Sequence, residues 1–166
     1  SCGKPVVAAV HGAAVGGGLG LALVADFRVT CPEARFSANF NRLGFHPGFG
    51  LSVTLPRLVG TQKAALLFYT GRRIGGDEAL AMGLADVLVA QDQVRAEAQK
   101  LAREIATSAP IAVQSTRWSL RQGLVEQIRS AVARESTEQN AQFKTADFRE
   151  GVAAYAARRE PRFTGD

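Results

Sequence analysis

Three consecutive glycines, Gly16 to Gly18, come directly before residues 19–25, which have helix-forming character and helix length. Glycines leave the backbone N–H groups unobstructed, and the first turn of a helix carries a partial positive charge. Such a turn can bind an anion or stabilise an oxygen on which negative charge develops. A purely structural reading stays open, in which the glycines only let a strand and a helix pack closely.

The spacing of these glycines argues against two common phosphate-binding motifs. A phosphate loop would need a lysine and a hydroxyl residue after Gly18, where Leu19 and Gly20 stand. A dinucleotide-binding fingerprint that starts at Gly16 would need a glycine where Leu21 stands. The chemistry that survives is a backbone donor for a carbonyl oxygen.

Two histidines are the other candidates for chemistry. His46 lies between Phe45 and Pro47, with Asn39 and Asn41 as polar groups on the approach, and an imidazole can act as general acid or base near neutral pH. It could equally cap the following helix or pack in the turn. For His11, at the end of a strand, we expect a hydrogen-bonded structural role.

The elements that position these residues have strand and helix patterns in alternation. Residues 5–10 form a continuous apolar run, which predicts a strand buried on both faces. The glycine turn over residues 11–18 follows it. Further strands are predicted at residues 27–30, 34–38 and 84–89, and helices at 51–58, 62–69 and 77–82, with Pro56 ending or bending the first of them.

From Val94 onward the pattern is helical, and Pro110 marks a helix start. Asp147, with Glu150 three residues later, resembles a capping box. We therefore expect an α/β protein, with residues 1–90 as its core and residues 91–166 as a helical region that packs on something, such as a neighbouring subunit. The predicted apolar stripes are Val94, Ala98, Leu101 and Ile105; Leu124, Ile128 and Val132; and Phe148, Val152 and Tyr155.

Composition narrows the class of protein. The 166 residues are 46% hydrophobic and 21% charged, which suits a globular domain with its own core. The two cysteines form no CxxC motif or Cys/His cluster, so we expect no disulfide framework, no metal site and a cytoplasmic location. The longest apolar runs are far shorter than the ~20 residues that cross a bilayer. The net charge of +5 includes no Lys/Arg run above two, so nucleic acid is a weak candidate partner.

Several motifs resemble one family when taken in order. Residues 4–26 resemble the signature segment of the crotonase (enoyl-CoA hydratase/isomerase) superfamily. The resemblance extends over essentially the whole chain. It continues through Ala34-Arg-Phe-Ser, Leu43-Gly-Phe-His-Pro-Gly-Phe-Gly50, Leu55-Pro-Arg-Leu-Val-Gly60, Thr70-Gly-Arg-Arg-Ile, Ala79-Leu-Ala-Met-Gly-Leu-Ala-Asp86 and Arg158-Arg-Glu-Pro-Arg-Phe163.

The resemblance implies a superhelix of ββα units followed by a helical trimerisation region, in a homotrimer or hexamer. It implies acyl-CoA substrates, with coenzyme A as part of the substrate and no separate cofactor. Gly17 matches the second of two backbone N–H donors to the thioester carbonyl. The first donor belongs to a motif upstream of Ser1, so we expect roughly the first third of a typical member to be missing. The residues expected at the substrate are Ala13, Gly16, Gly20, Asn39, Phe40, Leu43 and Gly48.

The sequence departs from the family pattern at its acids. Hydratases of the family carry two glutamates where this chain has Gly20 and Phe40, and isomerase and dehalogenase relatives often carry an acid where it has Gly48. Neither glycine nor phenylalanine can transfer a proton. We therefore expect an acyl-CoA enzyme that uses the oxyanion hole without the glutamate pair, with His46 as its candidate acid or base. A catalytically silent acyl-CoA-binding or assembly module is the alternative, and RNA binding a remoter one.

Several other side chains allow either a functional or a structural interpretation. Phe36, Phe40, Phe45 and Phe49 could line an apolar acyl pocket or pack in the core. Arg158, Arg159 and Arg162 could meet the phosphates of coenzyme A or lie in solvent at a helix end. For Asp26 we expect a structural salt bridge or turn role, and for Trp118 packing between helices.

Overall fold

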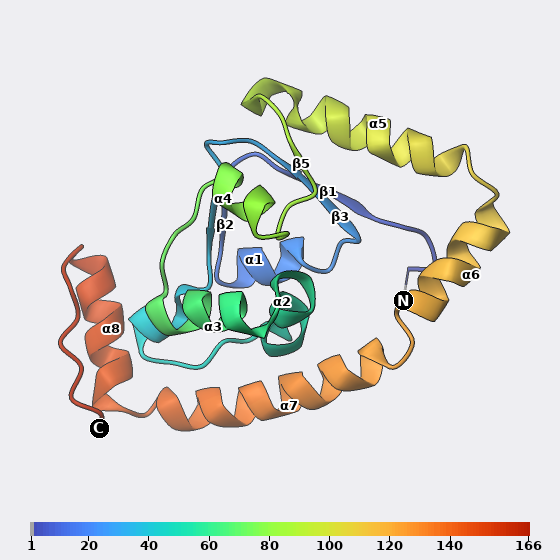
Figure 1. Ribbon diagram of the computed structural model, residues 1–166. Coiled ribbons are helices and arrows are strands. Elements are labelled where there is room, and N and C mark those ends of the chain that lie inside the picture. The colour runs from blue at the N-terminus through green and yellow to red at the C-terminus, as the bar shows by residue number, and fades with distance from the viewer. Residues whose placement is uncertain (1) are drawn as a thin grey trace.

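The core contains two β-sheets of parallel strands, and the chain contributes strands to them alternately as it winds through successive superhelical turns. The structure is a computed structural model that describes residues 2–166 (Figure 1). Strands β1 (Val7–Val10), β3 (Phe27–Thr30) and β5 (Val87–Leu88) form one sheet in the order β1-β3-β5, and β2 (Ala13–Val15) pairs with β4 (Arg35–Ser37) in the other. The register aligns Val7 with Phe27 and Ala13 with Arg35. The first superhelical turn (β1, β2) and the second (β3, β4) thus each contribute one strand to each sheet.

Strand β2 corrects the sequence prediction of an uninterrupted glycine turn over residues 11–18. Ala13, Ala14 and Val15 have little strand pattern of their own, but β4 lies alongside and pairs with all three. Ala14 is buried in the core. Tertiary pairing therefore decides this segment, as it often does for strands.

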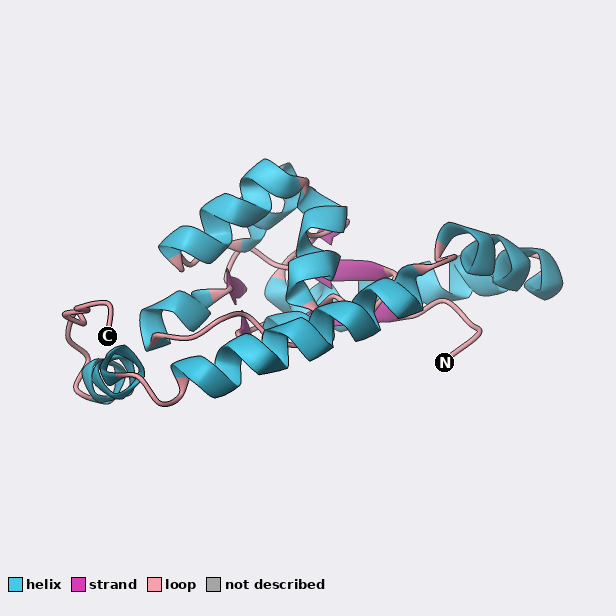
Figure 2. Cartoon of the chain, turned by 90° about the horizontal axis from the view of Figure 1, so that it is seen from below, coloured by secondary structure: helices cyan, strands magenta, loops and turns pink. Residues whose placement is uncertain are grey.

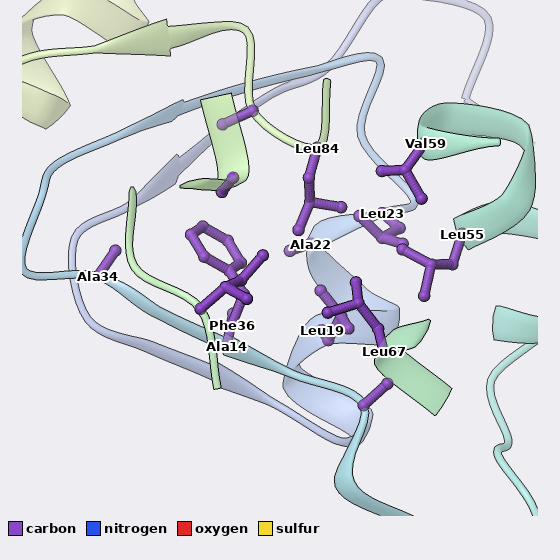
Figure 3. Close-up of a cluster of buried hydrophobic side chains, with 14 of the residues drawn as sticks. Ala14, Leu19, Ala22, Leu23, Ala34, Phe36, Leu55, Val59, Leu67 and Leu84 are labelled. Carbon is purple, nitrogen blue, oxygen red and sulfur yellow. The ribbon is translucent and has the colours of Figure 1, made fainter. Parts of the chain in front are cut away.

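Four short α-helices and one 3₁₀ helix complete the core. Helix α1 (Gly17–Ala22) follows β2, and 3₁₀ helix η1 (Asn39–Leu43) follows β4. Helices α2 (Leu51–Val59), α3 (Thr61–Thr70) and α4 (Gly76–Ala81) follow in turn. Leu19, Phe36, Leu55, Leu67 and Leu84 meet at the centre (Figure 3). Pro56 does not end α2, which runs on to Val59 and stops at Gly60, where φ is 80°.

The remaining helices curve around this core as an arc (Figure 1). After η2 (Gln91–Gln93), α5 (Val94–Ala106) packs on β1 and β3. Helix α6 (Pro110–Leu120) starts at the predicted Pro110 but buries no residue. Figure 2 shows α7 (Leu124–Gln142) crossing the molecule between α6 and α8 (Ala146–Ala156). No helix within residues 2–166 is long and apolar enough to span a membrane.

Two details of α8 differ from the sequence prediction. Its N-cap is Thr145, whose hydroxyl accepts from the N–H of Phe148, and not Asp147. Its buried residues are Gly151 and Ala154, whereas Val152 and Tyr155 are exposed. Small residues occupy the buried face because α8 lies against the η1 backbone, where a Cβ on Gly151 would come within 2.5 Å of the Leu43 carbonyl carbon.

Candidate oxyanion site

The glycine turn joins β2 to α1 through an unusual backbone at Gly16. This residue has φ 55° and ψ −118°, and its N–H donates to the Ser37 carbonyl at 2.9 Å. Helix α1 then starts at Gly17 with no side-chain cap and no acid in its first turn. The N–H groups of a first turn have no acceptor within their own helix. The turn therefore presents backbone donors with no carboxylate from its own helix opposing them.

Helix η1 approaches the turn from the β4 side. A Cβ on Gly16 would lie 3.8 Å from Cζ of Phe40 and 3.9 Å from Oδ1 of Asn39. Phe40 is buried and Asn39 half-buried. The structure thus brings Asn39 and Phe40, two of the residues expected at the substrate, to the glycine turn.

Phe49 lies across the first turn of α1. A Cβ on Gly17 would be 2.8 Å from its Cε2 atom, and a Cβ on Gly20 would be 2.5 Å from its Cβ atom. Both distances are shorter than real Cβ contacts. With Phe49 in this place, a side chain at position 20 would collide with the Phe49 Cβ atom, and one at position 17 would have to shift the Phe49 ring.

The other predicted aromatic residues separate from Phe49. Phe36 is buried in the core between the sheets and helices. Phe45 packs edge-on against Phe40, with ring centroids 5.5 Å apart, and also contacts Phe143 and Phe148. Of the four, Phe40 and Phe49 lie at the turn, while Phe36 and Phe45 support the fold around it.

His46 is held by its backbone against α7. Its N–H donates to Oε1 of Gln142 at 2.6 Å, and its carbonyl accepts from Nε2 of Gln139 at 2.8 Å. Its Nδ1 lies 2.7 Å from the Pro47 carbonyl, which can only accept, so the neutral ring carries its proton on Nδ1. His46 lines a cavity of about 460 Å³ together with the chain end at Phe163, and the glycine turn does not contribute to that cavity.

The remaining predicted site residues are dispersed. Ala13 is exposed on β2, and Leu43 ends η1 against Gly151. Gly48 is buried, and a Cβ there would lie 2.7 Å from Nε2 of Gln139. A side chain at Gly48 would therefore have to displace that amide. His11 was expected to make a structural hydrogen bond. Its side chain is exposed, and it is the backbone carbonyl of His11 that accepts a hydrogen bond from Gln91 at 2.9 Å.

Three polar residues of α7, none of which was expected from the sequence, hold the segment that carries Phe49. They are Glu135, Gln139 and Gln142, which share one helix face by their spacing of four and three. Glu135 is only 2% exposed and accepts from the N–H of Gly50 at 2.8 Å. One feature of the sequence could have indicated them: they continue the predicted stripe of Leu124, Ile128 and Val132 along the helix, but with polar side chains.

The predicted role of Asp26 is confirmed. Its carboxylate pairs with Nε of Arg117 at 2.9 Å and Nε of Arg121 at 3.1 Å, and accepts from the Val6 N–H at 2.8 Å. The packing role expected for Trp118 is wrong within this chain, because its side chain is exposed. Arg159 is engaged by Glu150 through both terminal nitrogens.

Comparison with known proteins shows the family to which the chain belongs. The enoyl-CoA hydratase/isomerase family model matches residues 1–166. The chain is 37% identical over 160 residues to a crotonyl-CoA hydratase of Syntrophomonas wolfei, covering 96% of this chain and 62% of that protein. It is 39% identical over 165 residues to the human mitochondrial enoyl-CoA hydratase domain-containing protein 2, covering 97% of this chain and 56% of that protein.

Solved structures agree in fold. A carnitinyl-CoA hydratase from Mycobacterium avium superposes with a TM-score of 0.93 at 29% identity, over 100% of this chain and 65% of that one. An enoyl-CoA hydratase/isomerase from Pseudoalteromonas atlantica gives 0.90 at 34% identity, over 99% and 66%. The chain spans about 60% of the length of the curated relatives it matches. The predicted fold class, a ββα superhelix followed by helices, is confirmed, and the chain belongs to the enoyl-CoA hydratase/isomerase family, the crotonase superfamily.

Proposed function

We propose that the protein acts on acyl-CoA thioesters and that the backbone N–H of Gly17 is one donor to the thioester carbonyl. The observation that carries the proposal is the uncapped first turn of α1, which begins at Gly17 with no acid in it. Negative charge that develops on the carbonyl oxygen as an enolate forms would be stabilised by this donor. One such donor is typically worth about 3 kcal/mol in a transition state.

The proposal includes no protein carboxylate at positions 20 and 40. Gly20 has no side chain, and the buried Phe40 ring cannot carry a proton. Hydration of an enoyl-CoA by a glutamate pair is therefore not the proposed reaction. His46 stays a candidate acid or base, although it lines the cavity beside Phe163 and not the glycine turn.

Two variants test the Gly17 donor with matched steric effects. Gly17→Ala and Gly17→Pro both add a Cβ against Phe49, but only proline removes the N–H, and proline is well tolerated at the first position of a helix. In the full natural-length protein with bound butyryl-CoA, we expect the thioester carbonyl band in the infrared to shift to lower wavenumber for the alanine variant and less so for the proline variant. Equal bands in the two variants would contradict the role of Gly17.

A second function is favoured by the missing carboxylates. The protein could bind acyl-CoA without turnover, as a silent binding or assembly module. Calorimetry with butyryl-CoA, together with an assay for exchange of its α-protons with solvent deuterium, separates the two, because enolate formation exchanges these protons whatever reaction follows. Binding with turnover supports the enzyme, binding without turnover supports the silent module, and absence of binding rejects both. Unchanged turnover in His46→Ala would remove that residue from the mechanism.

We further propose that the helical region assembles subunits into a trimer or hexamer. No residue of helix α6 is fully buried in its own chain, and Ile111, Trp118 and Leu120 are 83%, 68% and 69% exposed. Large apolar side chains exposed together are typical of an interface. Sedimentation analysis of the full-length protein should give a trimer or hexamer mass, and a monomer mass for the wild-type protein would contradict the assembly.

A further inference from the structure

Phe49 has a backbone conformation that bulky residues rarely adopt. Its φ of 62° lies in the left-handed region, and a non-glycine residue held there costs on the order of 1–3 kcal/mol. Burial does not repay this cost, because the side chain is 66% exposed. Strained residues of this kind persist only where their surroundings fix them, and they cluster at functional sites.

Helix α7 supplies the fixation on both sides of Phe49. Before it, the N–H and carbonyl of His46 bond to Gln142 and Gln139. After it, Glu135 accepts from the N–H groups of Gly50 and Ser52. The segment is thus tied to one helix at both ends, and Phe49 is set between the two attachments.

The side chain of Phe49 lies lengthwise on α1. Its Cβ is nearest to Gly20 and its ring edge is nearest to Gly17, and these two positions share one face of the helix because they are three residues apart. A glutamate at position 20 would meet the Phe49 Cβ at 2.5 Å before its carboxyl group could reach the turn. The aromatic ring therefore takes space beside the N–H of Gly17 that a position-20 side chain would otherwise need.

We propose that Phe49 is a specificity-determining residue that limits the bulk of the acyl group next to the thioester carbonyl. This inference rests on the proposed function at Gly17. An oxygen about 3 Å from the Gly17 nitrogen brings the first acyl carbons against the exposed face of the ring. Helix α7 holds the backbone on both sides of Phe49, so a branch at the carbon beside the carbonyl collides with the ring, whereas a straight chain passes along it.

Calorimetry with two isomeric esters tests the proposal without any need for turnover. We expect the full natural-length protein to bind butyryl-CoA more tightly than isobutyryl-CoA, and Phe49→Ala to reduce the ratio of dissociation constants about tenfold, since one misplaced methyl group in a pocket is worth 10-fold or more. Phe49→Tyr keeps the ring and should keep the ratio. Tyr69→Ala removes an exposed aromatic residue of α3 and is the matched control.

The outcomes separate the two proposals. If neither ester binds to the wild-type protein, the proposed function fails, and the inference fails with it. If both esters bind and the ratio is one, or is unchanged in Phe49→Ala, the role of Phe49 is wrong while acyl-CoA binding stands. Should Phe49→Ala not fold, Phe49→Leu, which removes the ring but keeps an apolar side chain, carries the same test.

Discussion

The carboxylate of Glu135 accepts from both the backbone N–H and the hydroxyl of Ser52, at 3.1 and 2.6 Å. Glu135 lies on α7, 83 residues further along the chain. Its carboxylate caps the N-terminus of α2, because the N-cap residue of that helix is Gly50, which has no side chain to do so. A negative charge at a helix N-terminus is also favoured by the helix dipole. The contact therefore stabilises α2 and the position of Phe49 together.

Replacing Glu135 should destabilise the protein strongly. Glu135→Ala leaves two N–H groups and a hydroxyl without their acceptor, and bonds to a charged group are worth about 1.5–3 kcal/mol each, not fully additively. We expect the free energy of unfolding to fall by about 3–5 kcal/mol, as measured by urea denaturation. Glu138→Ala, on the same helix and paired with Arg134 at the surface, should cost below about 1 kcal/mol. Equal losses in the two variants would contradict the structural role of Glu135.

Gly151→Ala should destabilise the protein although alanine is the better helix former. The substitution gains about 1 kcal/mol of helix propensity. Its Cβ, however, would lie 2.5 Å from the carbonyl carbon and 2.7 Å from the oxygen of Leu43. These are backbone atoms, and overpacking costs about 1–3 kcal/mol. Subtracting the propensity gain from the overpacking cost, we expect a net loss of up to about 2 kcal/mol in urea denaturation.

Gly18→Ala is the opposite case and serves as the control. Gly18 is also helical, but a Cβ there has no atom within 4 Å, so this variant should be neutral or more stable by up to about 1 kcal/mol. A gain in stability for Gly151→Ala would show that α8 does not lie against η1 as described.

Elements with a pattern of their own were predictable from the sequence. The apolar run at residues 5–10 contains β1, although this strand is only partly buried and not buried on both faces as expected, and Pro110 starts α6. Strand β2 and the buried face of α8 were not, because each is decided by its neighbour. Ala13–Val15 is a strand only through β4, and Gly151 is buried only because η1 comes close.

The residues of the candidate site also differ in whether local sequence could predict their position. Gly17 could be named from the glycine run and from the family resemblance, and Asn39 and Phe40 lie beside that turn. Phe49 could be grouped with other aromatic residues, but its position beside the glycine turn could not be predicted. That position depends on a left-handed backbone and on hydrogen bonds from a helix about 90 residues away, such as the bond between Gln139 and His46 at a separation of 93 residues. Local sequence carries no sign of such long-range contacts.

Removing the charge of Asp26 should loosen α6. Because that helix buries no residue, its attachment depends largely on polar contacts, among them the pairs of Asp26 with Arg117 and Arg121. Charged hydrogen bonds of about 1.5–3 kcal/mol correspond to at least tenfold in an opening equilibrium. We therefore expect amide hydrogen exchange in α6 to rise about tenfold or more in Asp26→Asn.

The matched control is Glu97→Gln, which removes a carboxylate from a surface pair with Lys100. Such a pair is worth at most about 1 kcal/mol, so exchange in α5 should change only severalfold. If α6 exchanges at the wild-type rate in Asp26→Asn, the carboxylate does not hold the helix.

Acid should release the chain end from α8 through Glu150. The hydrogen bond from Arg159, followed by the one from the Arg162 N–H, lowers the pKa of Glu150 from 4.5 to about 2. Because the folded pKa is depressed, this contact stabilises the fold fully above about pH 4.5, and the stabilisation is lost as the pH falls from there towards 2. The carboxyl carbon shift of Glu150 in NMR should therefore still report an ionised group at about pH 3.5. Arg159→Gln should move the midpoint up towards 4.5, whereas Arg158→Gln, one residue away, should leave it in place. A wild-type midpoint near 4.5 would mean that Arg159 does not hold Glu150 in solution.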